Sequence, residues 1–189
     1  MNSQTYPEGL TKQTITVPRM NVPFKEAVRL AGPWTPYISP EKKVKARARG
    51  EILIDSLIWQ AEDLYRDVSN PESGDVTLTL LNFGIGSRTA GPTALLIGKM
   101  EGLRPASPFE VFAVGANMPA LYGMLATEPA GILSPEPRML DGVNRACCVW
   151  LGSAQKECAF VPFDHPLHDG YWFAFVYEEE QEYSGILAW

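Results

Sequence analysis

The chain has few of the side chains that most often carry out chemistry near neutral pH. Its 189 residues include two His and three Cys. An odd number of Cys, two of them adjacent at Cys147 and Cys148, does not suit a disulfide framework, so reduced and mostly buried thiols are expected. Two His leave little general acid–base capacity, although carboxylates could still serve.

Signatures of enzymes and of cofactor sites are also missing. The chain contains no nucleophile elbow and no metalloprotease signature. The glycine-rich segment 84–92 follows an expected strand, but it lacks the Gly-Lys-Ser/Thr ending of a phosphate-binding loop. We therefore expect no cofactor, and the sequence favours a non-catalytic protein.

Long hydrophobic runs are absent. The longest apolar runs, at residues 159–163 and 171–177, are far too short to cross a bilayer. Residues 1–17 lack both the cationic start and the apolar run of a secretory signal. These absences predict a cytoplasmic protein that makes no contact with a membrane.

The length and composition predict a single domain over residues 1–189. An apolar fraction of 46% is ordinary for a globular protein, and this length can bury a sizeable core. Sixteen Pro and sixteen Gly imply many turns. Five of the Pro lie in residues 18–40, so we expect residues 1–40 to form a Pro-rich, extended N-terminal arm.

The clearest periodic signal lies in residues 49–68. Apolar side chains recur there at spacings of four, three, four and three, namely Ile54, Ile58, Ala61, Tyr65 and Val68. This is the period of an amphipathic helix with one buried face. Ser39 and Pro40 form a favourable helix start, so the helix is expected over about 41–68, either continuous or interrupted at Gly50.

Shorter elements surround this helix. Strands are expected at 12–17, 76–83, 146–151, 158–163, 171–177 and 183–189, and short helices at 24–31, 107–116 and 119–126. Residues 93–100 fit the returning strand of a hairpin or a short helix, and the strand is the favoured interpretation. Ser107 and Glu110 form the capping box of one of these helices. Residues 127–142 are expected to be a connection, and the last third an antiparallel meander. The fold class is therefore α+β, with a mostly antiparallel sheet packed against one long amphipathic helix and minor helices.

Charge is unevenly distributed along the chain, which has a net charge of −6. Residues 1–49 contain nine Lys/Arg and three Asp/Glu, whereas residues 50–189 contain seven and nineteen. Nucleic acid is therefore not an expected partner of the whole surface. Only the basic run 42–49 could bind a polyanion, and a solvated helical face, or an internal role opposite the acidic C-terminal part, is the favoured interpretation.

An acidic run follows the aromatic segment 171–177. It consists of Glu178, Glu179, Glu180 and Glu182. A solvated turn is one interpretation, because charged surface segments are common. The functional alternative is a patch that attracts a basic protein. Tyr177, Tyr183 and Trp189 would then supply the aromatic anchors that binding hot spots favour.

Both His lie in one short segment, at His165 and His168, flanked by Asp164 and Asp169. A divalent metal could bind the two imidazoles and a carboxylate, leaving one position for water. Pro166 argues against a helical pair of ligands, and Asp, Pro and Gly are turn residues. A turn before the next strand is the favoured interpretation.

The adjacent Cys147 and Cys148 could provide a nucleophile with a His as base. They alternate within an apolar segment, however, so at least one should point into the core, where burial makes a thiol inert.

Three hypotheses for function remain. The leading one is an acidic, non-catalytic protein that binds a basic protein, for example as an inhibitor or immunity-type protein. The second is a structural subunit of a virion or another assembly. The third is a metal-dependent hydrolase centred on Asp164 to Asp169. The sequence does not predict the oligomeric state.

Overall fold

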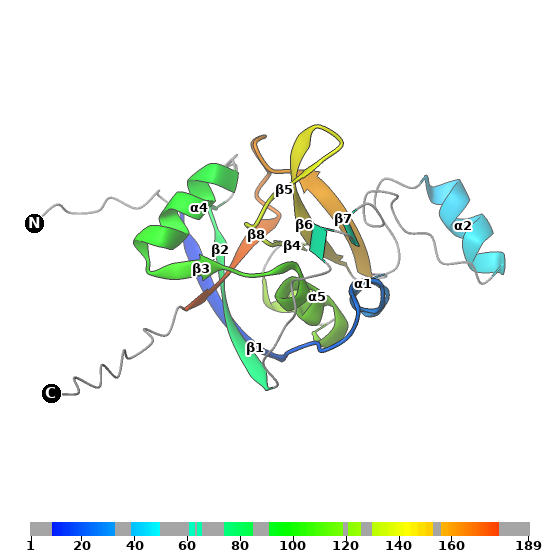
Figure 1. Cartoon of the computed structure of the whole chain (residues 1–189), viewed down its shortest axis with the longest axis horizontal. Helices are drawn as coiled ribbons and strands as arrows, with labels where there is room; N and C mark the ends of the chain where they lie inside the picture. The colour runs from blue at the N-terminus through cyan, green and yellow to red at the C-terminus, as the bar shows by residue number, and fades with distance from the viewer. Residues whose placement is uncertain are drawn as a thin grey trace, which may run out of the picture.

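The chain forms an α+β fold around one sheet (Figure 1). The computed structural model describes residues 9–32, 39–49, 61–62, 64–65, 74–84, 91–118, 121–125, 130–152 and 156–177. The helices are α1 (Phe24–Ala31), α2 (Pro40–Arg49), α4 (Gly91–Met100) and α5 (Pro108–Asn117), with a 3-10 turn at Leu121–Met124. The strands are β1 (Thr11–Pro18), β2 (Asp75–Asn82), β3 (Leu103–Pro105), β4 (Ala130–Leu133), β5 (Arg138–Leu140), β6 (Val143–Leu151), β7 (Lys156–Pro162) and β8 (Tyr171–Tyr177).

The sheet is mostly antiparallel, as predicted, and β8 lies at its centre. The strand order is β1-β2-β8-β4-β6-β5, with β3 beside β8 and β7 beside β6. One edge of β8 pairs with β2. The other edge pairs with β4 in parallel and then with β3. Because both edges of β8 are occupied, its backbone is held by hydrogen bonds on either side.

Both faces of β8 are buried. Trp172, Ala174 and Val176 belong to one apolar cluster, whereas Phe173 and Phe175 belong to a second cluster on the opposite face. Successive side chains of a strand point to opposite faces, so a continuous apolar run indicates a strand covered on both sides. The segment Tyr-Trp-Phe-Ala-Phe-Val-Tyr of β8 has this composition.

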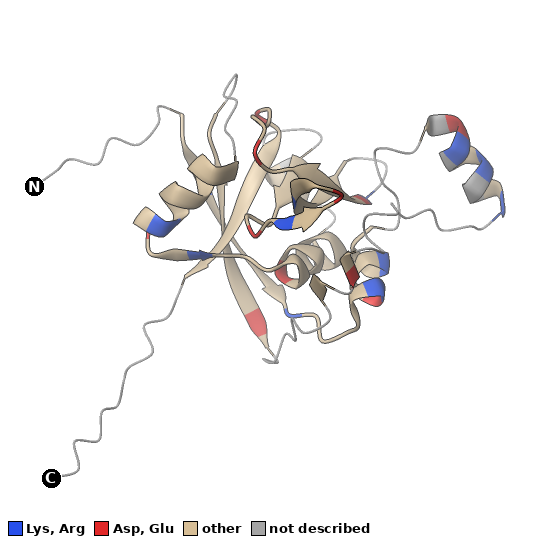
Figure 2. Cartoon of the chain, turned by 45° about the horizontal axis from the view of Figure 1, so that its top comes forward, with Lys and Arg blue, Asp and Glu red and all other residues tan. Residues whose placement is uncertain are grey.

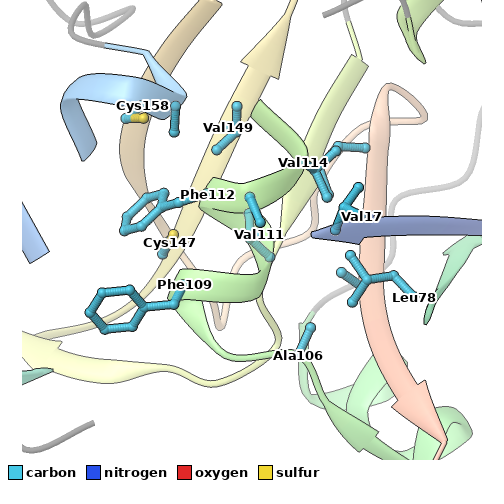
Figure 3. Close-up of a cluster of buried hydrophobic side chains, with 14 of the residues drawn as sticks. Val17, Leu78, Ala106, Phe109, Val111, Phe112, Val114, Cys147, Val149 and Cys158 are labelled. Carbon is cyan, nitrogen blue, oxygen red and sulfur yellow. The ribbon is translucent and has the colours of Figure 1, made fainter. Parts of the chain in front are cut away.

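One face of the sheet is covered by α1, by α5 and by the segment that contains Ala61 and Tyr65. The ring of Phe24 in α1 stacks on Tyr65, with centroids 5.5 Å apart, and meets the edge of Phe112 in α5 at 5.6 Å. Figure 3 shows Phe112 and Phe109 on α5 directed toward β6, where Cys147 and Val149 lie. The aromatic rings fill the space between these helices and the sheet.

The opposite face is covered by α4. Its residues Ala94 and Ile97 pack in the same cluster as Phe175. Gly98 lies so close to the sheet that a Cβ there would be 2.1 Å from Cε1 of Phe175. Glycine therefore allows α4 to approach β8, and this close approach fixes the position of the helix relative to the strand.

A buried carboxylate joins α5 to the segments before it. Ser107 caps α5: its hydroxyl oxygen accepts a hydrogen bond from the backbone N–H of Glu110, and the Glu110 carboxylate accepts one from the Ser107 N–H at 2.8 Å. Both carboxylate oxygens also accept hydrogen bonds from Arg104, and Arg19 adds another at 3.1 Å. Burial raises the pKa of Glu110, but the hydrogen bonds from Arg104 and Ser107, with the charges of Arg104 and Arg19, lower it overall.

Several predicted elements are confirmed. Strands β1, β2, β6, β7 and β8, helices α1 and α5, the start of α2 and the capping box at Ser107 match the predictions within a few residues. β1 and α1 lie inside the segment predicted to be an N-terminal arm. In the structure β1 pairs with β2, and α1 contributes Ala27 and Val28 to the core.

Three other predictions are wrong. Residues 93–100 belong to helix α4, because a short apolar run does not distinguish a strand from a buried helix. Residues 127–142, predicted to be a connection, contain β4 and β5. The predicted antiparallel meander is wrong at β8, which pairs with β2, β3 and β4 and not with the preceding strand β7. The hairpin of β6 and β7 is confirmed.

The long helix over about 41–68 stays a prediction. The structure describes α2 and a helical conformation at residues 61–62 and 64–65, while residues 50–60 lie outside the described part of the chain. Ala61 and Tyr65, both on the predicted apolar face, are buried.

Glu110→Gln should lower the free energy of unfolding by about 2–3 kcal/mol, because two arginines would lose their carboxylate in a buried site. The pKa of Glu110 is lower in the folded protein than its ordinary 4.5. Its stabilising contribution is therefore complete above that pH and is lost as the pH falls through the lowered value. Urea unfolding of wild type and Glu110→Gln, measured at a series of acidic pH values, gives the free energy of unfolding of each protein. The difference between the two values should become smaller as the pH falls.

Glu26→Gln is the matched control, since Glu26 pairs with Arg29 on an exposed surface of α1. It should change stability much less. An equal loss in the free energy of unfolding for both variants would show that the buried carboxylate of Glu110 stabilises the fold no more than an exposed one does.

Candidate binding surface

Tyr177, the last residue of β8, is the one predicted partner-binding residue that the structure describes. Phe173 and Phe175 face α4, so Tyr177, two residues further along the strand, points to the same side of the sheet. Tyr177 and Phe175 therefore share one side of the sheet, but their side chains differ in how far they are buried. Phe175 is completely buried, whereas Tyr177 is 56% exposed because it lies beyond the cover provided by α4.

Lys12 of β1 connects Tyr177 with the end of α4. The Lys12 Nζ lies 2.9 Å from the Glu101 carboxylate and 5.7 Å from the centroid of the Tyr177 ring. The hydrogen bond to Glu101 raises the pKa of Lys12, so its ammonium group stays protonated. Leu103 pairs with Tyr177 between β3 and β8, which places the residues just after α4 at the same corner.

Two large apolar side chains lie exposed on α4 at this end of the molecule. Leu96 is 59% exposed and Met100 45% exposed, and their spacing of four places them on one helical face. Met100 directly precedes Glu101, the partner of Lys12. We use the name β8 corner for Tyr177 and the Lys12–Glu101 pair, together with the exposed Leu96 and Met100 of the helix that leads into Glu101.

The β8 corner combines an exposed aromatic ring, exposed apolar side chains and an ion pair. This composition is typical of a protein-binding surface, where aromatic and methionine side chains are enriched. Both the ring and the helix face are attached to buried elements. Tyr177 continues the central strand, and α4 is held by its close approach at Gly98. The groups are therefore preorganised, which lowers the entropy cost of binding.

The other predicted partner-binding residues lie outside the described residues. They are Glu178, Glu179, Glu180, Glu182, Tyr183 and Trp189. The acidic run follows Tyr177 directly in the sequence. Figure 1 shows β8 ending beside β3 and α4.

The loop between β7 and β8 contains the predicted metal ligands. Asp164 accepts a hydrogen bond from the Asn144 amide at 3.0 Å, and His165 is exposed. His168 Nδ1 accepts the Gly170 N–H at 3.1 Å, and its ring stacks on Trp150 with centroids 5.8 Å apart. The nearest oxygen of Asp169 lies 3.8 Å from His168 Nδ1.

This geometry resembles a turn fixed by local contacts. Within the described ranges, no three His, Cys, Asp or Glu side chains come together in a way that could hold a metal ion. The metal site therefore stays a prediction that the arrangement of the loop does not support.

The thiols lie in the core. Cys147 belongs to the cluster beneath α5 and Cys148 to the cluster on the α4 face, so the adjacent residues point to opposite sides of β6. Cys158 is buried as well, with its Sγ 3.7 Å from the carbonyl oxygen of Val28. Burial raises the pKa of all three thiols, which is the opposite of what a nucleophilic cysteine requires.

Comparisons with protein families, curated proteins and solved structures found no match to this chain. Among the described helices, none is long and apolar enough to cross a membrane.

Sequence reasoning missed most of the β8 corner. Leu96 and Met100 fall in the segment predicted to be a strand, where residues four apart share a face but lie about 13 Å apart, not on adjacent helical turns. Lys12 is distant from Glu101 in sequence. The recurrence of Pro92, Leu96 and Met100 every four residues was the available signal.

A thiol-specific reagent should label the folded protein very slowly at all three positions, because each thiol is buried and its pKa is raised. Labelling should become rapid in denaturant, and its rate in mild urea should follow the population of unfolded protein. Absorbance of the released reagent group gives both rates. One thiol reacting rapidly under native conditions would contradict the burial of that residue.

Proposed function

We propose that this protein acts by binding another protein, with the β8 corner as the centre of the contact surface. The exposure of Tyr177 at the end of a fully buried strand is the observation that supports this proposal best. A tyrosine ring buries a large area at a low cost in side-chain entropy, and such residues dominate binding hot spots.

The partner is a basic protein in this proposal. The acidic run Glu178, Glu179, Glu180 and Glu182 continues the chain from Tyr177, and Tyr183 and Trp189 add aromatic groups further on. Complementary charge speeds association, and an aromatic centre slows dissociation. An inhibitor or immunity-type protein of the cytoplasm, which covers a basic enzyme such as a nuclease, would use both effects.

The described residues favour binding over thiol catalysis, because the three Cys are buried and have raised pKa values. The structural subunit and the metal-dependent hydrolase remain the alternatives predicted from the sequence. The hydrolase gains no support from the loop, because Asp164 and His168 each accept a hydrogen bond from a neighbouring protein group.

Tyr177→Ala should weaken the complex with the partner about 30-fold, which corresponds to loss of a hot-spot residue of about 2 kcal/mol. The full-length protein is used to isolate its partner from its own host, and the dissociation constant is then measured with the purified partner by calorimetry. Neutralising Glu178, Glu179, Glu180 and Glu182 to Gln should mainly reduce the association rate and its dependence on salt.

Met139→Ala provides the control, because Met139 is a large side chain, 60% exposed, on β5 at the other end of the sheet path. It should leave the affinity unchanged. A partner bound equally well by wild type and by Tyr177→Ala would refute the β8 corner. Recovery of no stoichiometric partner, or of an acidic one, would refute the proposed function.

A further inference from the structure

Helix α2 is a strongly basic element of an acidic protein. Its ten residues contain five Lys/Arg and a single Glu, while the whole chain has a net charge of −6. Lys42, Val44, Lys45, Ala48 and Arg49 are all exposed. Figure 1 and Figure 2 both show α2 apart from the sheet and from the other helices, and Figure 2 shows blue Lys and Arg residues on it.

Local interactions favour the helical conformation of α2. Ala, Lys, Arg and Glu have high helix propensity, and they make up most of the segment after Pro40. The Ser39 hydroxyl accepts the Lys42 N–H at 3.4 Å at the start of the helix. Val44, 66% exposed, is the only large apolar residue, so α2 presents no apolar face to a core.

Three of the five cations share one side of the helix. Lys42, Lys45 and Arg49 occupy positions i, i+3 and i+7, which fall on a single face of a helix. Ten residues rise about 15 Å. This face therefore presents positive charge over a length comparable to several successive phosphates of a nucleic-acid strand.

We propose that α2 binds the phosphate backbone of duplex DNA without sequence preference. The class of ligand follows from the chemical groups that the basic face contains and from those that it does not contain. An α-helix fits the major groove of B-form DNA, and Lys and Arg supply the backbone contacts.

Other occupants suit α2 less well. The helix has no aromatic residue on which unpaired bases could stack, as single-strand binding requires. It has no apolar face to enter a lipid surface. It also lacks the aromatic anchors that protein interfaces depend on. This inference uses a different surface from the β8 corner, so neither proposal depends on the other.

Binding should be weak and sensitive to salt, since it depends on release of counterions and the rest of the protein is acidic. Anisotropy of a labelled duplex of about 20 bp, titrated with the full chain between about 50 and 200 mM salt, gives the affinity and its salt dependence. Lys42→Gln with Lys45→Gln should weaken binding at least about tenfold at the lowest salt and reduce the salt slope by about 1.8.

The control is Lys25→Gln with Arg29→Gln, which removes the same charge from two exposed positions of α1. It should bind DNA nearly as wild type does, and circular dichroism should show both variants folded. Three results would each overturn the proposal: no binding of duplex by wild type at low salt, equal losses in both variants, or α2-dependent binding of anionic vesicles or an acidic peptide in preference to duplex. Equal affinity for the single strand would refute the assignment to duplex.

Discussion

The structure depends on the burial of β8 on both faces and the pairing of both its edges. Phe173 and Phe175 pack toward α4, while Trp172, Ala174 and Val176 pack toward α1 and α5. Burying each large side chain contributes about 2–3 kcal/mol. The burial requires a helical layer on each side of the sheet, which explains why α4 approaches so closely at Gly98 and why α5 is held by the buried Glu110.

The candidate binding surface is a consequence of how this strand ends. Tyr177 lies two residues beyond Phe175 along β8. It keeps the orientation of a core residue, but its side chain is largely exposed to solvent. The same rigid elements that bury Phe175 therefore position an exposed aromatic ring. The basic helix α2 is different, because nothing in the sheet requires it. Charge alone distinguishes it, whereas the β8 corner is distinguished by an exposed aromatic ring beside an ion pair.

Much of the fold could be predicted from periodicity and capping. The alternation in β1 and β2 and the Ser107 capping box lead directly to the observed elements. Helix α4 could not, because four successive apolar residues fit a strand or a buried helix equally well, and only packing against Phe175 decides between them. The same limit hid the candidate site. Lys12, Glu101 and Tyr177 meet through strand pairing of distant segments, which no local pattern shows.

Amide hydrogen exchange measured by NMR tests the central claim, that β8 organises the molecule. If β8 is held on both edges and both faces, the amides of 173–176 should be among the slowest to exchange, with a free energy equal to that of global unfolding. Protection should decrease outward to β1, which pairs with β2 alone among the described strands. Exchange of the β8 amides by local opening, at a free energy well below that of global unfolding, would contradict the account.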